Sequence, residues 1–213
     1  MKKLFFISLF ILLFSCENLD HNIISSSLST SEIKSNHLYG LKSGIITYKI
    51  TINGSIKDTI ISGEGIEKVY FDHWGKTMLK EEKITKAIKT KHFNSLKKEQ
   101  IAIHNLKKIE NNRVYIVDYH NKLINLSLNN NNTKNNVLKT LKGEKKDHEV
   151  INGYDCEIWT IKGTKQWLYK DIPLKKEQIL KGIKTIKEAV SADFNVVIIN
   201  TEIELPNYPI IKE

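Results

Sequence analysis

Apolar and polar residues alternate along much of the chain after residue 43, which is the pattern of β-strands with one buried face. The clearest example is the segment 44–52, in which every second residue is large and apolar: Ile46, Tyr48, Ile50 and Ile52. Asn53-Gly54 follows directly, and this pair is typical of a two-residue hairpin turn because both positions need positive φ. The sequence therefore predicts a strand, a tight turn at Asn53-Gly54 and a returning strand.

Further strands are predicted wherever the alternation resumes between turn residues. Their ranges are 55–62, 66–74, 77–85, 101–109, 113–119, 122–128, 154–162, 165–170, 173–180 and 194–200. Gly63-Glu64-Gly65 is expected to break the chain, and the segment 86–98 is ambiguous, with a loop as one interpretation. A short helix is expected from Thr133 to Gly143. The segment 183–190 stays open between strand and helix, because its isoleucines also have helical spacing.

These elements predict a mainly β protein. About 9 to 11 strands would form a curved antiparallel sheet, a half-barrel or a barrel, with one or two short helices. Strands do not alternate with helices along the chain, which excludes a doubly wound parallel sheet. A curved sheet has a concave face, and that face must be covered by a helix, a lid or a ligand.

The N-terminus has the features of an export signal. Lys2 and Lys3 precede an apolar run, residues 4–14, that is too short to span a bilayer. Leu13-Phe14-Ser15-Cys16 resembles the lipobox of bacterial lipoproteins. That resemblance implies removal of residues 1–15, acyl chains on Cys16 and attachment to a membrane through them. The alternatives are an ordinary signal peptide with a coincidental cysteine and a simple N-terminal anchor.

The lipobox resemblance sets the expected domain organisation and location. A serine-rich segment, 16–38, would be a lipidated tether, and 39–213 would form a single β-rich domain. The location would be the bacterial cell envelope, on either the periplasmic face of the outer membrane or the inner membrane. Glu17 at the second mature position leaves the choice of membrane open.

The charge of the chain argues against a nucleic-acid reader. The formal net charge is +9, but Arg113 is the only arginine, and lysine lacks the forked guanidinium that reads bases. The lysines are expected to lie mainly on solvated faces, with weak attraction to anionic lipid.

Cys156 is the only cysteine besides Cys16, so no disulfide within the mature chain is expected. Tyr154, Cys156 and Ile158 would share one face of a strand. Flanking acids at 155 and 157 raise a thiol pKa, so Cys156 is expected to be buried rather than reactive.

No pattern of catalytic or metal-binding residues is present. The seven histidines form neither His-x-x-x-His nor His-Glu-x-x-His, and Gly-x-Ser-x-Gly is absent. Asp118 and His120 would share one strand face, but a structural or surface role is favoured. We therefore expect no enzyme activity, no metal and no cofactor.

Large aromatic residues lie near the predicted strand ends. They are either ordinary core or the lining of an apolar cleft within the open sheet. The candidates for cleft lining are Tyr48, Phe71, Trp74, Tyr154, Trp159, Trp167, Tyr169 and Phe194.

Four segments carry a resemblance to a family of bacterial envelope lipoproteins. They are 43–48, 70–75, Gly153-Tyr154-Asp155-Cys156…Trp159 and 167–175. Their layout is similar to the LolA/LolB-like half-barrels, open β-structures that shuttle lipoproteins or sense envelope stress. The resemblance implies that 183–190 is a strand. It supplies no catalytic residue.

Together these features predict a non-catalytic envelope lipoprotein. Its sheet would bind a lipid, another apolar ligand or an amphipathic segment of an envelope protein in a cleft. The alternative is a structural or protein-interaction lipoprotein whose core is filled by its own side chains and which binds no ligand.

Overall fold

The computed structural model describes residues 37–212 except 93–94, 130–143 and 162. The predicted signal peptide, Cys16, nearly all of the predicted tether and the helix predicted from Thr133 lie outside the described residues. The described residues form one unit.

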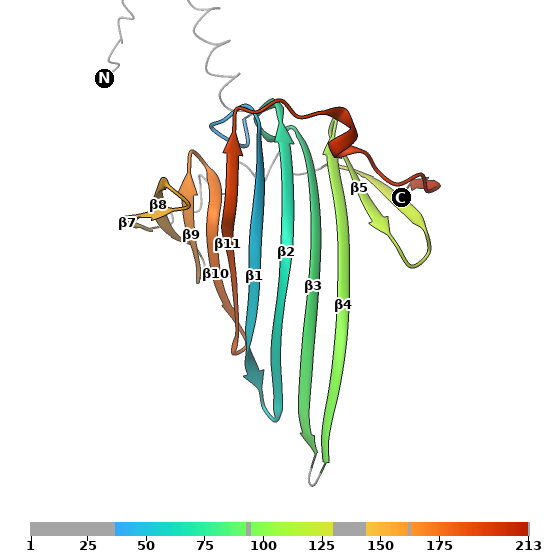
Figure 1. Cartoon of the computed structure of the whole chain (residues 1–213), viewed down its shortest axis with the longest axis vertical. Helices are drawn as coiled ribbons and strands as arrows, with labels where there is room; N and C mark the ends of the chain where they lie inside the picture. The colour runs from blue at the N-terminus through green and yellow to red at the C-terminus, as the bar shows by residue number, and fades with distance from the viewer. Residues whose placement is uncertain (1–36, 93–94, 130–143, 162, 213) are drawn as a thin grey trace, which may run out of the picture. The chain divides into compact units, whose positions relative to one another are not determined.

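Twelve strands form one sheet (Figure 1). They are β1 (Gly44–Ile56), β2 (Thr59–Asp72), β3 (Thr77–His92), β4 (Ser95–Glu110), β5 (Arg113–Asp118), β6 (Leu123–Leu128), β7 (Glu144–Ile151), β8 (Tyr154–Ile161), β9 (Thr164–Tyr169), β10 (Ile172–Leu180), β11 (Ile183–Phe194) and β12 (Ile210–Lys212). Their order is β12-β6-β5-β4-β3-β2-β1-β11-β10-β9-β8-β7, and every neighbouring pair is antiparallel except β12 with β6. Within the described residues the edge strands β12 and β7 do not pair, so the sheet is open.

The predicted fold class is confirmed: the protein is mainly β, with a curved antiparallel sheet. The sheet has one strand more than the upper end of the predicted range. The segment 183–190 lies in β11 and is a strand. The helical elements of the described part are two 3-10 turns, η1 (His73–Gly75) and η3 (Asn200–Ile203).

The hairpin turn predicted at Asn53-Gly54 is wrong. β1 continues through both residues to Ile56, and the chain turns at Lys57-Asp58. Gly54 serves a different purpose, because a Cβ there would lie 2.3 Å from the carbonyl oxygen of Gly182. The glycine therefore lets β1 and β11 approach closely.

The chain break predicted at Gly63-Glu64-Gly65 is also wrong, because β2 runs through all three residues. A Cβ on Gly65 would lie 2.7 Å from Cγ1 of Ile84 in β3. The missing side chain leaves room for Ile84 to lie over β2. The sequence shows Gly63 and Gly65, but it does not show that the Ile84 side chain fills the space over Gly65.

The ambiguous segment 86–98 is not a loop but belongs largely to the long β3–β4 hairpin, which is held by a continuous backbone ladder. The strand expected at 194–200 is absent, because β11 ends at Phe194. Asn195 adopts φ 57°, and its backbone N–H donates to the Ser43 carbonyl at 2.9 Å, which turns the chain out of the sheet.

The sheet curls toward the face that carries Ile46, Tyr48 and Ile50, here called the inner face. Side chains from β1, β2 and β3 pack there in one cluster with side chains from β7 to β10. Strands that are not neighbours in a sheet contact each other through their side chains only if the sheet bends, so the inner face is concave.

The segment 37–43 closes one end of the inner face. The N–H of Leu38 donates to the Trp74 carbonyl at 3.0 Å, and the N–H of Gly40 donates to the Lys170 carbonyl at 2.9 Å. Leu38, Tyr39 and Leu41 pack into the inner cluster. This segment therefore joins the β2–β3 turn to the β9–β10 turn.

The C-terminal segment covers the opposite, outer face at the same end of the sheet. Ile198, Ile203, Leu205 and Tyr208 pack against a second cluster, formed by Tyr70, Leu79, Leu106, Val117 and Ile124. The Ser43 hydroxyl donates to the Val196 carbonyl at 2.6 Å, and the N–H of Ile124 donates to the Pro209 carbonyl at 2.9 Å. At this end both faces are thus covered by the chain itself.

Candidate functional site

The inner face has two apolar zones, and six of the eight aromatic residues singled out from the sequence lie in the first or pack against it. This aromatic cluster occupies the end closed by 37–43. Trp167, Phe71 and Tyr48 are its largest members and are only 2%, 1% and 3% exposed. They are packed by the chain's own side chains.

Hydrogen bonds fix several of these rings across the bend of the sheet. The Tyr48 hydroxyl donates to the Pro173 carbonyl at 2.9 Å, and the Tyr154 hydroxyl donates to the Ala192 carbonyl at 3.0 Å. The indole N–H of Trp167 donates to the Glu149 carboxylate at 2.6 Å. Their polar atoms are therefore satisfied within the protein.

The other five candidates lie nearer the surface. Tyr154, Tyr169 and Phe194 form a group with ring centres 4.8 to 5.7 Å apart, packed against the aromatic cluster. Trp74 lies in η1 and stacks on His37 at 4.4 Å. Trp159 lies in β8 and donates its indole N–H to Glu157 at 3.0 Å. That any of the eight lines a ligand cleft stays a prediction.

The second zone consists entirely of isoleucines, here called the isoleucine cluster. Ile50, Ile52 and Ile84 are 3%, 6% and 8% exposed, and Ile61, Ile103 and Ile183 are partly buried against them. The six residues come from β1, β2, β3, β4 and β11, which are consecutive strands of the one sheet. Among the described residues no helix or second sheet packs on this cluster.

Strand register explains how these isoleucines meet. Ile50 pairs with Gly65, Gly65 with Ile84, and Ile84 with Ile103. Because Gly65 has no side chain, Ile84 leans over it toward Ile50. The alternation in β1 is visible in the sequence, whereas its partners in β3 and β4 depend on strand register.

Charged and polar residues occupy the outer positions of the same strands, such as Lys49, Glu64 and Lys89, all exposed. An antiparallel sheet with one apolar face normally packs that face on another layer. The apolar surface continues to the far hairpin turns, where Ile56 and Leu180 are 38% and 62% exposed. The isoleucine cluster is therefore a candidate surface for an apolar ligand.

A belt of charged residues separates the two apolar zones. Glu67, only 6% exposed, bonds to the amine of Lys187, which also lies 4.4 Å from the centre of the Tyr48 ring. Lys80 and Lys107 lie in the neighbouring row of the inner face. Burial lowers the pKa of Lys80 below its ordinary value, and the nearby Glu67 carboxylate opposes this shift. The Lys187 and Lys107 amines lower the pKa further, whereas Glu82 raises it.

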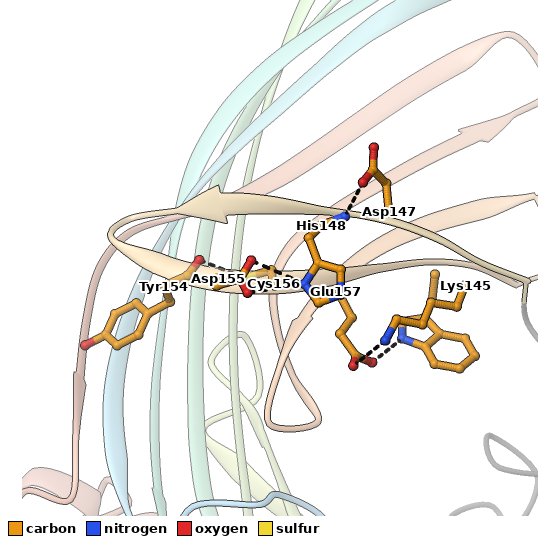
Figure 2. Close-up of polar contacts among 8 residues, drawn as sticks. Lys145, Asp147, His148, Tyr154, Asp155, Cys156 and Glu157 are labelled. Atoms are coloured by element: carbon orange, nitrogen blue, oxygen red, sulfur yellow. Dashed lines mark hydrogen bonds and ion pairs between the residues drawn. The ribbon is translucent and has the colours of Figure 1, made fainter.

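Cys156 is fully buried between Tyr154 and Ile158 in β8, as predicted. Burial raises the pKa of its thiol to about 11, and the thiol donates to the Tyr154 carbonyl at 3.4 Å. Figure 2 shows that the polar contacts nearby, such as those of His148 with Asp155 and of Lys145 with Glu157, involve exposed side chains. The thiol is thus a core group.

Asp118 has a structural role at the β5–β6 turn, where it accepts N–H groups from His120 and Asn121 at 2.9 and 3.0 Å. Within the described ranges no group of histidine, cysteine and acidic side chains is arranged to hold a metal ion. The same residues include no helix of the length and apolarity needed to cross a membrane.

A hollow of about 220 Å³ lies beside the parallel pair β6 and β12 and is lined by Arg113, Leu126, Ser127, Leu128 and Lys212. Small-molecule pockets usually enclose about 300 to 1,000 Å³. The isoleucine cluster is therefore the stronger candidate site.

Neither a protein-family model nor a curated protein sequence matches this chain. Among solved structures, an uncharacterised conserved protein from Thermus thermophilus is 12% identical, with 87% of this chain and 99% of that chain covered and a TM-score of 0.46. LprF from Mycobacterium bovis is 9% identical, with 85% and 97% covered and a TM-score of 0.35. A Vibrio parahaemolyticus domain described as outer membrane lipoprotein-sorting is 13% identical, with 82% and 94% covered and a TM-score of 0.29. Similarities this weak do not define the function of this chain.

Proposed function

We propose that this protein is a non-catalytic lipoprotein of the bacterial envelope that binds an apolar chain on its isoleucine cluster. The chain would belong to a lipid or to an amphipathic segment of a partner protein. The observation that carries the proposal is an isoleucine-rich inner face with which no other layer of the described residues packs.

Burial supplies the binding free energy in this proposal. Removing apolar surface from water stabilises a complex by about 25 cal/mol per Å², or about 0.8 kcal/mol for each buried CH₂ group. Five consecutive strands present the isoleucines side by side, and their outer faces carry polar residues that keep this part of the sheet in water. A long acyl chain lying across the cluster would cover the partly buried members Ile61, Ile103 and Ile183.

The lipidated N-terminus would hold this surface close to a membrane. Acyl chains on Cys16 are the expected anchor, since each buried CH₂ group adds about 0.8 kcal/mol and two or three chains bind firmly. Cys16→Ala should abolish metabolic labelling with palmitate and leave unprocessed precursor. Labelling that persists in the variant would rule out this anchor.

Neighbouring residues on opposite faces of β2 give a matched test of the binding surface. Ile61 lies on the inner face, whereas Ile60 and Ile66 lie on the outer face and are 56% and 59% exposed. The chain from residue 17 onward should bind a fluorescent fatty acid. Ile61→Gln with Ile103→Gln should weaken binding about thirtyfold or more, because burying each of the two unpaired amides costs about 1 to 3 kcal/mol. Ile60→Gln with Ile66→Gln should leave binding unchanged, and equal losses in both pairs would refute the assignment.

The filled aromatic cluster favours a second candidate function, a structural or protein-interaction role without a ligand. Its three largest members are almost completely buried by the protein itself, and the edge strand β7 exposes Val150 at 65%. If this role is correct, the isolated chain binds no fatty acid, and changes at β7 abolish partner binding instead.

A further inference from the structure

Two lysines on the inner face lie directly opposite each other. Lys80 in β3 pairs with Lys107 in β4 in the strand register, and Val69 in β2 pairs with Lys80 on the other side. Side chains at opposite positions of an antiparallel pair have Cβ atoms about 4.5 to 5.5 Å apart, and like charges there destabilise the sheet. The chain therefore retains an unfavourable pair on the face assigned to ligand binding.

The nearby carboxylates of Glu67 and Glu82 attract the Lys80 amine, but their direct contacts are with other side chains. Glu67 bonds to Lys187, and Glu82 accepts a hydrogen bond from the Asn105 amide at 3.0 Å. Neither Lys80 nor Lys107 makes a hydrogen bond or an ion pair with any described residue. Both side chains are partly buried, so they keep less hydration than surface lysines do.

The position of the lysine pair relates it to the isoleucine cluster. Ile84 lies four residues along β3 from Lys80, and Ile103 lies four residues along β4 from Lys107. At about 3.3 Å per residue this separation is about 13 Å.

Beyond the cluster, Ile56 and Leu180 lie at the hairpin turns that end β1 and β10, and they are 38% and 62% exposed. Glu82 and Asn105, which are hydrogen-bonded to each other, lie between the lysines and the isoleucines on the same face. A molecule with a charged head and a long apolar tail would span these surfaces.

We propose that Lys80 and Lys107 bind the anionic headgroup, a carboxylate or a phosphate, of an amphiphile whose tail lies on the isoleucine cluster. This inference rests on the proposed function, because it assigns the head of a ligand whose tail the proposed function already places. An anion between the two amines replaces their repulsion with two charge-assisted hydrogen bonds. The headgroup of the amphiphile lies on the side of the isoleucine cluster that adjoins the aromatic cluster, and the tail extends away from it.

The test compares three probes that share an oleoyl chain: oleate, oleoyl-lysophosphatidic acid and monooleoylglycerol, which is uncharged. Lys80→Met with Lys107→Met should weaken binding of the anionic probes by about tenfold or more, because hydrogen bonds to charged groups contribute about 1.5 to 3 kcal/mol. Binding of monooleoylglycerol should change less than twofold. The ratio of oleate to lysophosphatidic acid affinity distinguishes carboxylate from phosphate recognition.

A matched control removes two lysines from the outer face of the same sheet. Lys49 in β1 and Lys89 in β3 are exposed, so Lys49→Met with Lys89→Met lowers the net charge equally. This control should leave the affinity for all three probes unchanged. Equal loss of anionic binding in the control and the inner-face variant would overturn the headgroup site.

The remaining outcomes separate this inference from the proposed function. If the inner-face variant binds all three probes as the unchanged chain does, the headgroup site is wrong and the apolar surface stands. If the unchanged chain binds none of them, both are wrong. If the double variant does not fold, binding of the probes to the unchanged chain is measured at increasing salt concentration instead. Salt should weaken oleate binding but not monooleoylglycerol binding, and equal responses would overturn the site.

Discussion

The amine of Lys187 in β11 bonds to the carboxylate of Glu67 in β2, across the intervening strand β1. The two residues are 120 positions apart in the sequence. The same amine lies over the ring of Tyr48, at 4.4 Å from its centre. This ion pair therefore joins β2 to β11 where the aromatic and isoleucine zones meet.

We predict that Lys187→Met lowers the free energy of unfolding by about 3 kcal/mol, because it leaves the Glu67 carboxylate buried without a partner. Replacing both residues, with Glu67→Leu and Lys187→Met, should restore most of the loss. Urea unfolding followed by circular dichroism measures both effects. Lys184→Met is the control, since its partner Glu177 lies in a more exposed pair at 3.2 Å and its loss should cost less than about 1 kcal/mol. Equal losses in the two single variants would contradict the buried character of the Glu67 pair.

Gly65→Ala should destabilise the protein by about 1 to 3 kcal/mol through overpacking. A Cβ at this position would lie 2.4 Å from the Lys83 carbonyl oxygen and 2.7 Å from Ile84 Cγ1. Gly63→Ala is a graded comparison, because its nearest neighbour, the Thr85 carbonyl oxygen, lies at 3.0 Å. Urea midpoints should fall in the order unchanged chain, Gly63→Ala, Gly65→Ala. A midpoint for Gly65→Ala at or above that of the unchanged chain would show that Ile84 does not lie over β2.

The thiol of Cys156 should make stability depend on pH at the alkaline end. Burial raises its pKa from the ordinary value of 9.0 to about 11. Between these values the folded chain binds more protons than the unfolded chain. Its contribution to stability is therefore complete below pH 9 and is lost as the pH rises through about 11. Urea unfolding from pH 8 to 11 should show a fall that Cys156→Ala lacks, after correction for the variant's lower stability. If the free energy of unfolding depends on pH in the same way in the unchanged chain and in Cys156→Ala, the raised pKa of the Cys156 thiol is refuted.

Ser43 connects the start of β1 to the C-terminal segment on the outer face. Ser43→Ala removes the hydrogen bond to the Val196 carbonyl and should cost about 1 kcal/mol. Because the segment after Phe194 is held by this bond and by packing on the second cluster, limited proteolysis should cleave it faster in the variant. Unchanged cleavage in residues 195–209 would mean that packing alone holds the segment.

Strand-rich architecture was predictable because alternation with a period of two is a local property. The strands predicted at 113–119 and 154–162 are found as β5 and β8 almost over their full predicted ranges. Turns are harder, since Asn-Gly and Gly-Glu-Gly occur both in turns and where strands approach closely. Gly54 and Gly65 belong to the second kind, and the atoms that decide this, in Gly182 and Ile84, are far away in the sequence.

The candidate site was less predictable than the fold. Aromatic size drew attention to residues such as Trp167 and Phe71, but size also makes them the first to fill a core. Ile84 and Ile103 carry no local signal of a site. Their importance comes from register, which aligns them with Ile50 across Gly65. The opposed lysines at 80 and 107 are likewise visible only once β3 and β4 are paired.

Native mass spectrometry of the chain from residue 17 onward, purified from a bacterial host, tests the isoleucine surface most directly. The account predicts a second mass for the unchanged chain, heavier than the first by one acyl-bearing molecule. This second mass should disappear in the variant carrying Ile61→Gln and Ile103→Gln. It should persist in the variant carrying Ile60→Gln and Ile66→Gln. A single ligand-free mass for the unchanged chain, with no binding of added oleate, would contradict it.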